Sequence, residues 1–206
     1  MKLYDSIGPN PRVVKMFMAE KGINIPRVTV DLMAGENRQP AHVARNPGGQ
    51  MPTLELDDGR YLAEVTAICE YLDEKHPTPP LIGTNAEERA MTRMWTRRVD
   101  LYIVEPMLTG FRAAEGYALF KDRMRLLPQA AADLKAIAQE KISWLDGLIA
   151  GREFIAGDRL TLADILLFCT LDFGATVGQP LKRDNANIAA WFDRVAARPS
   201  AGASKT

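Results

Sequence analysis

The 206-residue sequence contains little cysteine and little histidine. Its two cysteines, Cys69 and Cys169, lie far apart among apolar neighbours, which excludes a disulfide framework and a clustered thiolate metal site. Its two histidines, His42 and His76, are too few for the usual catalytic zinc triad. We therefore expect a reducing compartment and no bound metal.

Net charge and long apolar runs are also missing. Lys plus Arg number 26 and Asp plus Glu also number 26, so no net field attracts nucleic acid or an anionic membrane. The densest apolar run, at residues 165–169, is far shorter than the roughly 20 residues that span a bilayer. The opening MKLYDSIG lacks the basic and apolar segments of a signal peptide. We expect a cytoplasmic protein with neither nucleic-acid nor membrane partners.

The character of the sequence changes once, at the proline-rich segment PTPPLIGTNA. Before it, apolar patterns of period two alternate with patterns of period 3.6, and after it every segment has the helical period. The sequence predicts an α/β domain over residues 1–77, a linker over residues 78–86 and an all-helical domain over residues 87–206. The residues from Pro199 to Thr206 are expected to form a loose tail of the helical domain.

The first domain is predicted to run strand, helix, strand, irregular segment, hairpin, helix. Apolar residues at helical spacing predict a helix over residues 11–22, with glycine at its end. Val28, Val30 and Leu32 alternate with polar residues, which predicts a strand with one buried face. An Asp-Asp-Gly turn predicts a hairpin over residues 54–62.

The second domain contains one helix with a well-defined start. In the segment FIAGDRLTLADI, Thr161 fits the N-cap and Asp164 fits position N3 of a capping box. Leu160 and Ile165 then form a hydrophobic staple. The following residues are apolar almost all round, so we expect a central buried helix and a structural role for both capping residues. Earlier in this domain, Pro106 is expected to kink or break a helix.

Three stretches together resemble the cytosolic glutathione S-transferase family over roughly residues 1–200. They are LYDSIGPNPRVVKMFMAEKGI, NPGGQMPTLELDDGRYLAEVTAICEYL and the FIAGDRLTLADI segment. The resemblance implies a thioredoxin-like N-terminal domain of order βαβαββα and an all-helical C-terminal domain. It also implies a homodimer, glutathione as co-substrate and an active site in the cleft between the domains.

The resemblance assigns several residues to glutathione. It implies that the Met51-Pro52 bond is cis and that Met51 pairs with the cysteinyl backbone of the tripeptide. It implies that Glu64 binds the γ-glutamyl ammonium, while the amides of Val65 and Thr66 hold the adjacent carboxylate. The family commonly has serine directly after this glutamate, and this chain has Val65, so a hydroxyl contact is lost unless Thr66 replaces it.

Other positions have two interpretations. Gln50 and Arg38 are candidates for the glycine end of glutathione, although long polar side chains are usually solvated. For the thiolate, Asn10 stands where relatives of the cysteine type have cysteine, and Ser6 offers a hydroxyl in the same turn. We predict that Asn10 and Ser6 act jointly, with a backbone amide or water as the competing donor. Tyr4 also carries a hydroxyl, but it lies within the first strand.

An apolar electrophile is predicted to bind along the first long helix of the second domain. Trp95, Tyr102, Met107 and Phe111 are candidates for an apolar wall, with Arg98 as a polar neighbour. Such a stripe at helical spacing is more often core.

The main functional hypothesis is a glutathione transferase. A glutathione-dependent disulfide reductase is the first alternative, because the turn has no thiol of its own and any reduction must use glutathione. A non-catalytic glutathione-binding or scaffold protein is the second, because of Val65 and the missing usual activating residue.

Overall fold

The computed structural model describes residues 1–205, which divide into two compact units. Unit 1 comprises residues 1–84 together with the segment from Pro199 onward, and unit 2 comprises residues 85–198. The break between residues 84 and 85 falls inside the proline-rich segment.

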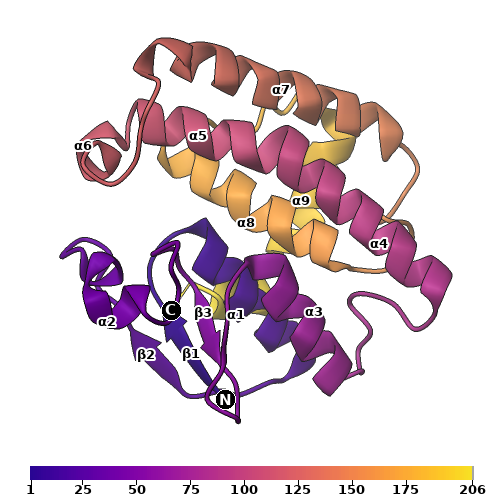
Figure 1. Cartoon of the computed structure of the whole chain (residues 1–206). Helices are drawn as coiled ribbons and strands as arrows, with labels where there is room; N and C mark the ends of the chain where they lie inside the picture. The colour runs from indigo at the N-terminus through magenta and orange to yellow at the C-terminus, as the bar shows by residue number, and fades with distance from the viewer. Residues whose placement is uncertain (206) are drawn as a thin grey trace. The chain divides into compact units, whose positions relative to one another are not determined.

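Unit 1 has the thioredoxin-like order that the resemblance implies, with the short helix α2 in the segment that the residue pattern predicts to be irregular. Its four-stranded sheet has the order β2-β1-β3-β4, in which β1 and β2 are parallel and the other pairs are antiparallel. The short helix α2 lies beside the edge strand β2 (Figure 1). The elements are β1 (Lys2–Asp5), α1 (Pro9–Lys21), β2 (Arg27–Thr29), a 3₁₀ turn (Glu36–Arg38), α2 (Pro40–Val43), β3 (Thr53–Glu55), β4 (Tyr61–Leu62) and α3 (Val65–Lys75).

Helix α1 contributes its apolar face to the core of unit 1. Proline occupies its start, where a missing N–H costs no helical hydrogen bond. Its apolar side chains Val13, Val14 and Phe17 are fully buried. The helix ends as predicted at Gly22, which adopts a left-handed conformation with φ of 64°.

The strand expected over residues 28–32 is shorter than predicted. Strand β2 covers only Arg27–Thr29, and the Val28 side chain is exposed, while Val30 beyond the strand is buried. The prediction of one buried face for Val28, Val30 and Leu32 is therefore wrong. The reason is that β2 is an edge strand of three residues, too short for its alternation to decide which face is covered.

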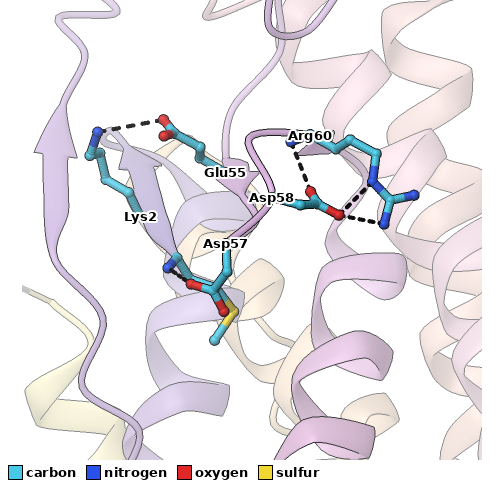
Figure 2. Close-up of polar contacts among 6 residues, drawn as sticks. Lys2, Glu55, Asp57, Asp58 and Arg60 are labelled. Carbon is cyan, nitrogen blue, oxygen red and sulfur yellow. Dashed lines mark hydrogen bonds and ion pairs between the residues drawn. The ribbon is translucent and has the colours of Figure 1, made fainter.

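The predicted hairpin is present as β3 and β4. Its turn is fixed by Asp58, whose carboxylate accepts hydrogen bonds from the backbone and the guanidinium of Arg60 (Figure 2). Gly59 in this turn has φ of 83°, which favours glycine. Next to the turn, the amino terminus of the chain pairs with Asp57, and Lys2 lies 3.5 Å from Glu55 (Figure 2).

The end of the chain is not a loose tail of the helical unit. Residues Pro199–Ala203 form α10, which packs on α1 within unit 1. The Arg12 guanidinium donates hydrogen bonds to the Ser204 hydroxyl and the Ala201 carbonyl, and Ser200 hydrogen-bonds to Glu20. The segment consists of a few small residues without an apolar pattern, so the sequence does not predict its packing. Thr206, the last residue of the expected tail, lies outside the described residues.

Unit 2 is helical throughout, as predicted. The expected irregularity before Pro106 is a five-residue π-helical segment between two α-helices, and α7 packs along α5 (Figure 1). None of the helices within residues 1–205 is long and apolar enough to cross a membrane. The helices are α4 (Ala86–Val99), the π segment η2 (Asp100–Val104), α5 (Glu105–Ala113), α6 (Tyr117–Phe120), α7 (Ala131–Leu148), α8 (Leu162–Thr176) and α9 (Ala186–Ala196), with a 3₁₀ turn at Pro128–Ala130.

The start of α8 carries the capping box described from the sequence. The Asp164 carboxylate accepts from the backbone N–H of Thr161 at 2.8 Å. It also accepts from the Ile155 N–H at 2.9 Å and the Trp191 indole N–H at 2.8 Å. Complete burial raises the pKa of Asp164. The one carboxylate therefore ties the start of α8 to the preceding loop and to α9.

Candidate functional site

The loop at residues 46–53 leads into β3 and carries the cis Met51–Pro52 bond that the resemblance implies. The Met51 side chain is only 8% exposed and packs with Tyr4 and Val30. The sheet thus fixes this residue through its side chain.

The Met51 backbone is left unpaired. Neither its N–H nor its carbonyl forms a hydrogen bond within residues 1–205. Two residues further on, Thr53 already pairs with Tyr4 in the antiparallel β1–β3 ladder. Because peptide groups need partners, an extended ligand segment can pair with Met51 as an added strand.

Two side chains from the 3₁₀ turn before α2 donate hydrogen bonds to the carbonyls of the glycines that precede Gln50 and Met51. Arg38 Nη1 donates to the Gly48 carbonyl at 3.2 Å, and Asn37 Nδ2 donates to the Gly49 carbonyl at 2.7 Å. Arg38 therefore braces the loop, whichever further contact it makes. The side chain of Gln50 is exposed beside them and makes no polar contact with the rest of the described chain.

The carbonyl of Gln50 is held by two donors. Asn46 Nδ2 donates to it at 3.0 Å, and His42 Nε2 lies 3.2 Å from it. Both side chains are buried, with 6% of Asn46 and 2% of His42 exposed. The peptide that joins Gln50 to Met51 is thereby fixed from one side.

Glu64 lies directly before α3 in an unusual backbone conformation. Its φ of 67° is the only positive φ of a residue other than glycine within residues 1–205. Such a conformation costs about 1–3 kcal/mol and is most often kept at functional sites. Its carboxylate is exposed, and no side chain caps the helix, so the first amides of Val65 and Thr66 face no protein acceptor.

The turn before α1 is the predicted thiol end of the site. Gly8, with φ of 111°, precedes the helix without a side-chain cap, and the first turn contains no acidic residue. Asn10 lies in that first turn and is partly exposed, and its side chain has no hydrogen-bond partner within the described residues. The positive end of the helix and a free amide donor are therefore adjacent.

Ser6, the other predicted donor, is engaged within the domain. Its hydroxyl donates to the Val30 carbonyl at 2.7 Å, and its N–H donates to the Asp5 carboxylate at 2.8 Å. A hydroxyl has one proton to donate, so in this conformation none is left for a ligand. Ser6 instead anchors the turn to the sheet.

The Tyr4 hydroxyl, like that of Ser6, is engaged within the domain. It donates to Glu55 at 2.8 Å, and the Arg45 guanidinium lies 4.4 Å from the centre of the Tyr4 ring. Burial and this hydrogen bond raise the pKa of Tyr4, and the same bond lowers the pKa of Glu55. Tyr4 is therefore a part of the sheet and not a donor to a bound sulfur.

The residues predicted to line an electrophile site do not form one aromatic wall. Trp95 is buried with the Arg98 guanidinium 4.8 Å from its ring. Tyr102 is 43% exposed and stacks edge-on against Trp144 of α7. The Phe111 ring makes its aromatic contacts elsewhere, with Phe120 and Phe173.

The distances along the helix explain this separation. Trp95 and Phe111 are 16 positions apart along α4, η2 and α5, which is about 24 Å at the rise of an α-helix. Met107 is completely buried, with its methyl against Gly174, so it belongs to the core of unit 2. The helical stripe thus splits into core contacts and exposed positions.

Sequence reasoning missed the residues that hold the loop. No sequence pattern distinguishes Asn46 as a site residue, and the sequence suggests only a metal ligand as a role for His42. The Asn-Pro-Gly-Gly pattern was a usable signal, because Asn46 Oδ1 accepts from the Gly48 N–H as in an Asx turn. The part of the chain that the structure describes contains no group of three His, Cys, Asp or Glu side chains suited to a metal.

Comparisons with known proteins identify the family of the chain. The N-terminal domain of the glutathione S-transferase family matches residues 7–75, and the C-terminal domain of that family matches residues 117–199. Glutathione S-transferase 2 of Saccharomyces cerevisiae is 32% identical over 97% of this chain and 87% of its own length. The chain belongs to the glutathione S-transferase family.

Solved structures of family members have the same fold. The crystal structure of Gtt2 from Saccharomyces cerevisiae has a TM-score of 0.92 and 31% identity, covering 99% of this chain and 100% of that one. A glutathione S-transferase domain-containing protein from Marinobacter aquaeolei VT8 has a TM-score of 0.91 and 37% identity, covering 97% and 99%. The similarity therefore extends over both units.

Proposed function

We propose that the protein is a glutathione transferase that binds the tripeptide on unit 1 and keeps its thiol ionised. The observation that carries this proposal is the unpaired backbone of Met51. Side chains hold the loop before it (the braced loop, residues 46–50), and β3 begins two residues after it. Glutathione presents an extended cysteinyl backbone with one N–H and one carbonyl. These groups match the carbonyl and the N–H of Met51 as one more antiparallel pair.

The two ends of the tripeptide are assigned to charged and hydrogen-bonding groups on either side of Met51. The γ-glutamyl carboxylate meets the first amides of α3 at Val65 and Thr66, and its ammonium meets the Glu64 carboxylate. This use explains why Glu64 is held at a positive φ. The exposed amide of Gln50 is assigned to the glycine carboxylate, with Arg38 beside it.

The thiol is assigned to Asn10 and the start of α1. A cysteine-type thiol ionises near about pH 8.5, and lowering its pKa by two units requires about 2.7 kcal/mol. A hydrogen bond from an amide to a charged sulfur supplies about 1.5–3 kcal/mol, and the helix end supplies about 0.3–1 kcal/mol. The two together suffice. Ser6 acts indirectly, by anchoring the turn to Val30.

The reaction then needs no general base on the protein. On binding, the thiol proton leaves to solvent, and the sulfur lone pair forms the new bond to an electrophilic carbon. With an aryl halide, the halide leaves with the electron pair of the broken bond. Substrate preference is assigned to unit 2, where Tyr102 is the exposed aromatic candidate among the predicted residues.

Calorimetric titration with glutathione tests the binding half of the proposal. Glu64→Gln is expected to weaken binding at least tenfold, because the ammonium loses its ionic partner. Glu74→Gln, an exposed glutamate further along α3, is the matched control and should bind like the wild type. Equal affinity of both variants would contradict the assignment of Glu64.

Turnover separates the proposal from its alternatives. A transferase should conjugate a chlorodinitrobenzene faster than it reduces a small mixed disulfide of glutathione. The reverse ranking would favour the disulfide reductase. Glutathione binding without an ultraviolet thiolate band at neutral pH would favour a binding protein. Assembly as a homodimer and location in the cytoplasm stay predictions from the sequence.

A further inference from the structure

The carbonyl of Gln50 is the only backbone acceptor in the braced loop that receives two side-chain donors, as far as the described residues show. A carbonyl oxygen only accepts hydrogen bonds, so His42 carries its proton on Nε2 in this arrangement. His42 Nδ1 has no partner within residues 1–205. The only hydrogen bond of the ring within the described residues is therefore the one that Nε2 donates to this carbonyl.

Asn46 connects the loop at four points. Its Nδ2 donates to the Gln50 carbonyl and, at 3.3 Å, to the Thr53 hydroxyl, and its Oδ1 accepts from the Gly48 N–H. Its backbone carbonyl accepts from the Gly49 N–H at 2.8 Å. One buried amide thus spans the loop from its first glycine to the start of β3.

We propose that His42 and Asn46 are positioning residues that preset the Gln50–Met51 peptide for the tripeptide backbone. The inference rests on the proposed function, because it concerns the same Met51 pair. The carbonyl and the N–H of one peptide group point in opposite directions. Fixing the Gln50 carbonyl on the α2 side therefore turns the Met51 N–H away from α2, ready to donate to a ligand.

Preorganisation of this kind affects binding more than chemistry. The hydrogen bonds of the two side chains go to Gln50, Gly48 and Thr53 and not to the Asn10 turn, so their loss should leave the rate of the bound complex nearly unchanged. A merely structural role would instead lower stability without a selective effect on the affinity for glutathione.

Steady-state kinetics with glutathione and a chlorodinitrobenzene test this split. His42→Ala and Asn46→Ala are each expected to raise the KM for glutathione about tenfold with kcat within about twofold of wild type. His42→Gln, which keeps a donor, should restore most of the affinity. Leu72→Ala, a buried residue of α3, serves as a destabilised control whose KM should not change. Proportional losses of kcat, or an equal rise of KM in the control, would overturn the inference.

The histidine content offers an independent spectroscopic test. The chain contains two histidines, so the imidazole ¹⁵N spectrum has one signal set for His42 and one for the exposed His76. We expect His42 to be the Nε2–H tautomer and its signals to move on saturation with S-methylglutathione, while those of His76 stay in place. An Nδ1–H tautomer for His42 would overturn the inference even if glutathione binds. A chain that binds no glutathione by calorimetry would instead contradict the proposed function.

Discussion

The two ends of the proposed glutathione site are built differently, although both belong to unit 1. In the loop at residues 46–53, every carbonyl from Gly48 to Gln50 accepts a hydrogen bond from a side chain. In the turn before α1, a Cβ added to Gly8 would meet no atom within 4 Å, Ile7 is exposed, and the Asn10 side chain has no partner within the described chain. The first region is braced and the second is open.

The two regions meet different physical requirements, one for binding the ligand and one for its chemistry. A backbone that pairs with a ligand must be rigid, because ordering it on binding would cost affinity. A donor to a thiolate must instead keep its hydrogen-bonding capacity free until the sulfur arrives. The braced loop and the open turn meet these two requirements separately.

Glycine substitutions should give the largest contrast between the two regions. In Gly49→Ala the new methyl would lie 2.8 Å from the Arg38 guanidinium and 3.1 Å from the Asn37 carbonyl, at a φ of 59°. Backbone strain and the clash together should cost about 2–4 kcal/mol. In Gly8→Ala the methyl meets nothing within 4 Å, so only backbone strain remains. Urea unfolding of both variants measures the order, and a larger loss for Gly8→Ala would contradict it.

Ser6→Ala should separate anchoring from chemistry in the turn. The Val30 carbonyl loses its donor, so stability should fall by about 1–2 kcal/mol. The kcat for an aryl halide should stay within about threefold of wild type, because the hydroxyl proton is not available to the sulfur. Thermal unfolding and initial rates are the two measurements. A loss of kcat above tenfold in a stably folded variant would restore Ser6 as a direct donor.

Tyr4→Phe should have the smallest effect, and it is visible mainly through pH. The Tyr4 hydroxyl is the first cause of the lowered pKa of Glu55. Because the folded pKa is below the unfolded value, the stabilisation is present above about pH 4.3 and is lost as pH falls through the folded pKa. The wild type should therefore exceed Tyr4→Phe in stability at neutral pH and lose this advantage in acid, with unchanged turnover. A pH-independent difference would contradict this origin.

Local motifs explain what could be predicted from the sequence. Gly22 at the end of α1, the Asp-Asp-Gly turn and the Thr161–Asp164 capping box each act within a few residues, so their patterns specify geometry directly. The buried apolar character of α8 likewise followed from its composition.

The features that the sequence does not predict depend on contacts between residues that are brought together only by folding. The side chains of Asn46 and His42 converge on one carbonyl only after the loop and α2 have packed, and no spacing rule encodes that convergence. The exposure of Val28 depends on the sheet ending at β2. The anchoring role of Ser6 depends on a hydrogen bond to Val30, a residue 24 positions away, which no local pattern indicates.

The most direct test of the thiolate assignment is the ionisation of glutathione bound to the wild type and to Asn10→Ala. Difference absorbance of the thiolate, titrated with pH under saturating glutathione, gives the pKa of the bound sulfur. In the wild type this pKa should lie about two units below that of the free thiol, and in Asn10→Ala it should rise by about one to two units. An identical pKa in both proteins would contradict the assignment of Asn10, and a pKa equal to that of free glutathione in the wild type would contradict the proposed activation.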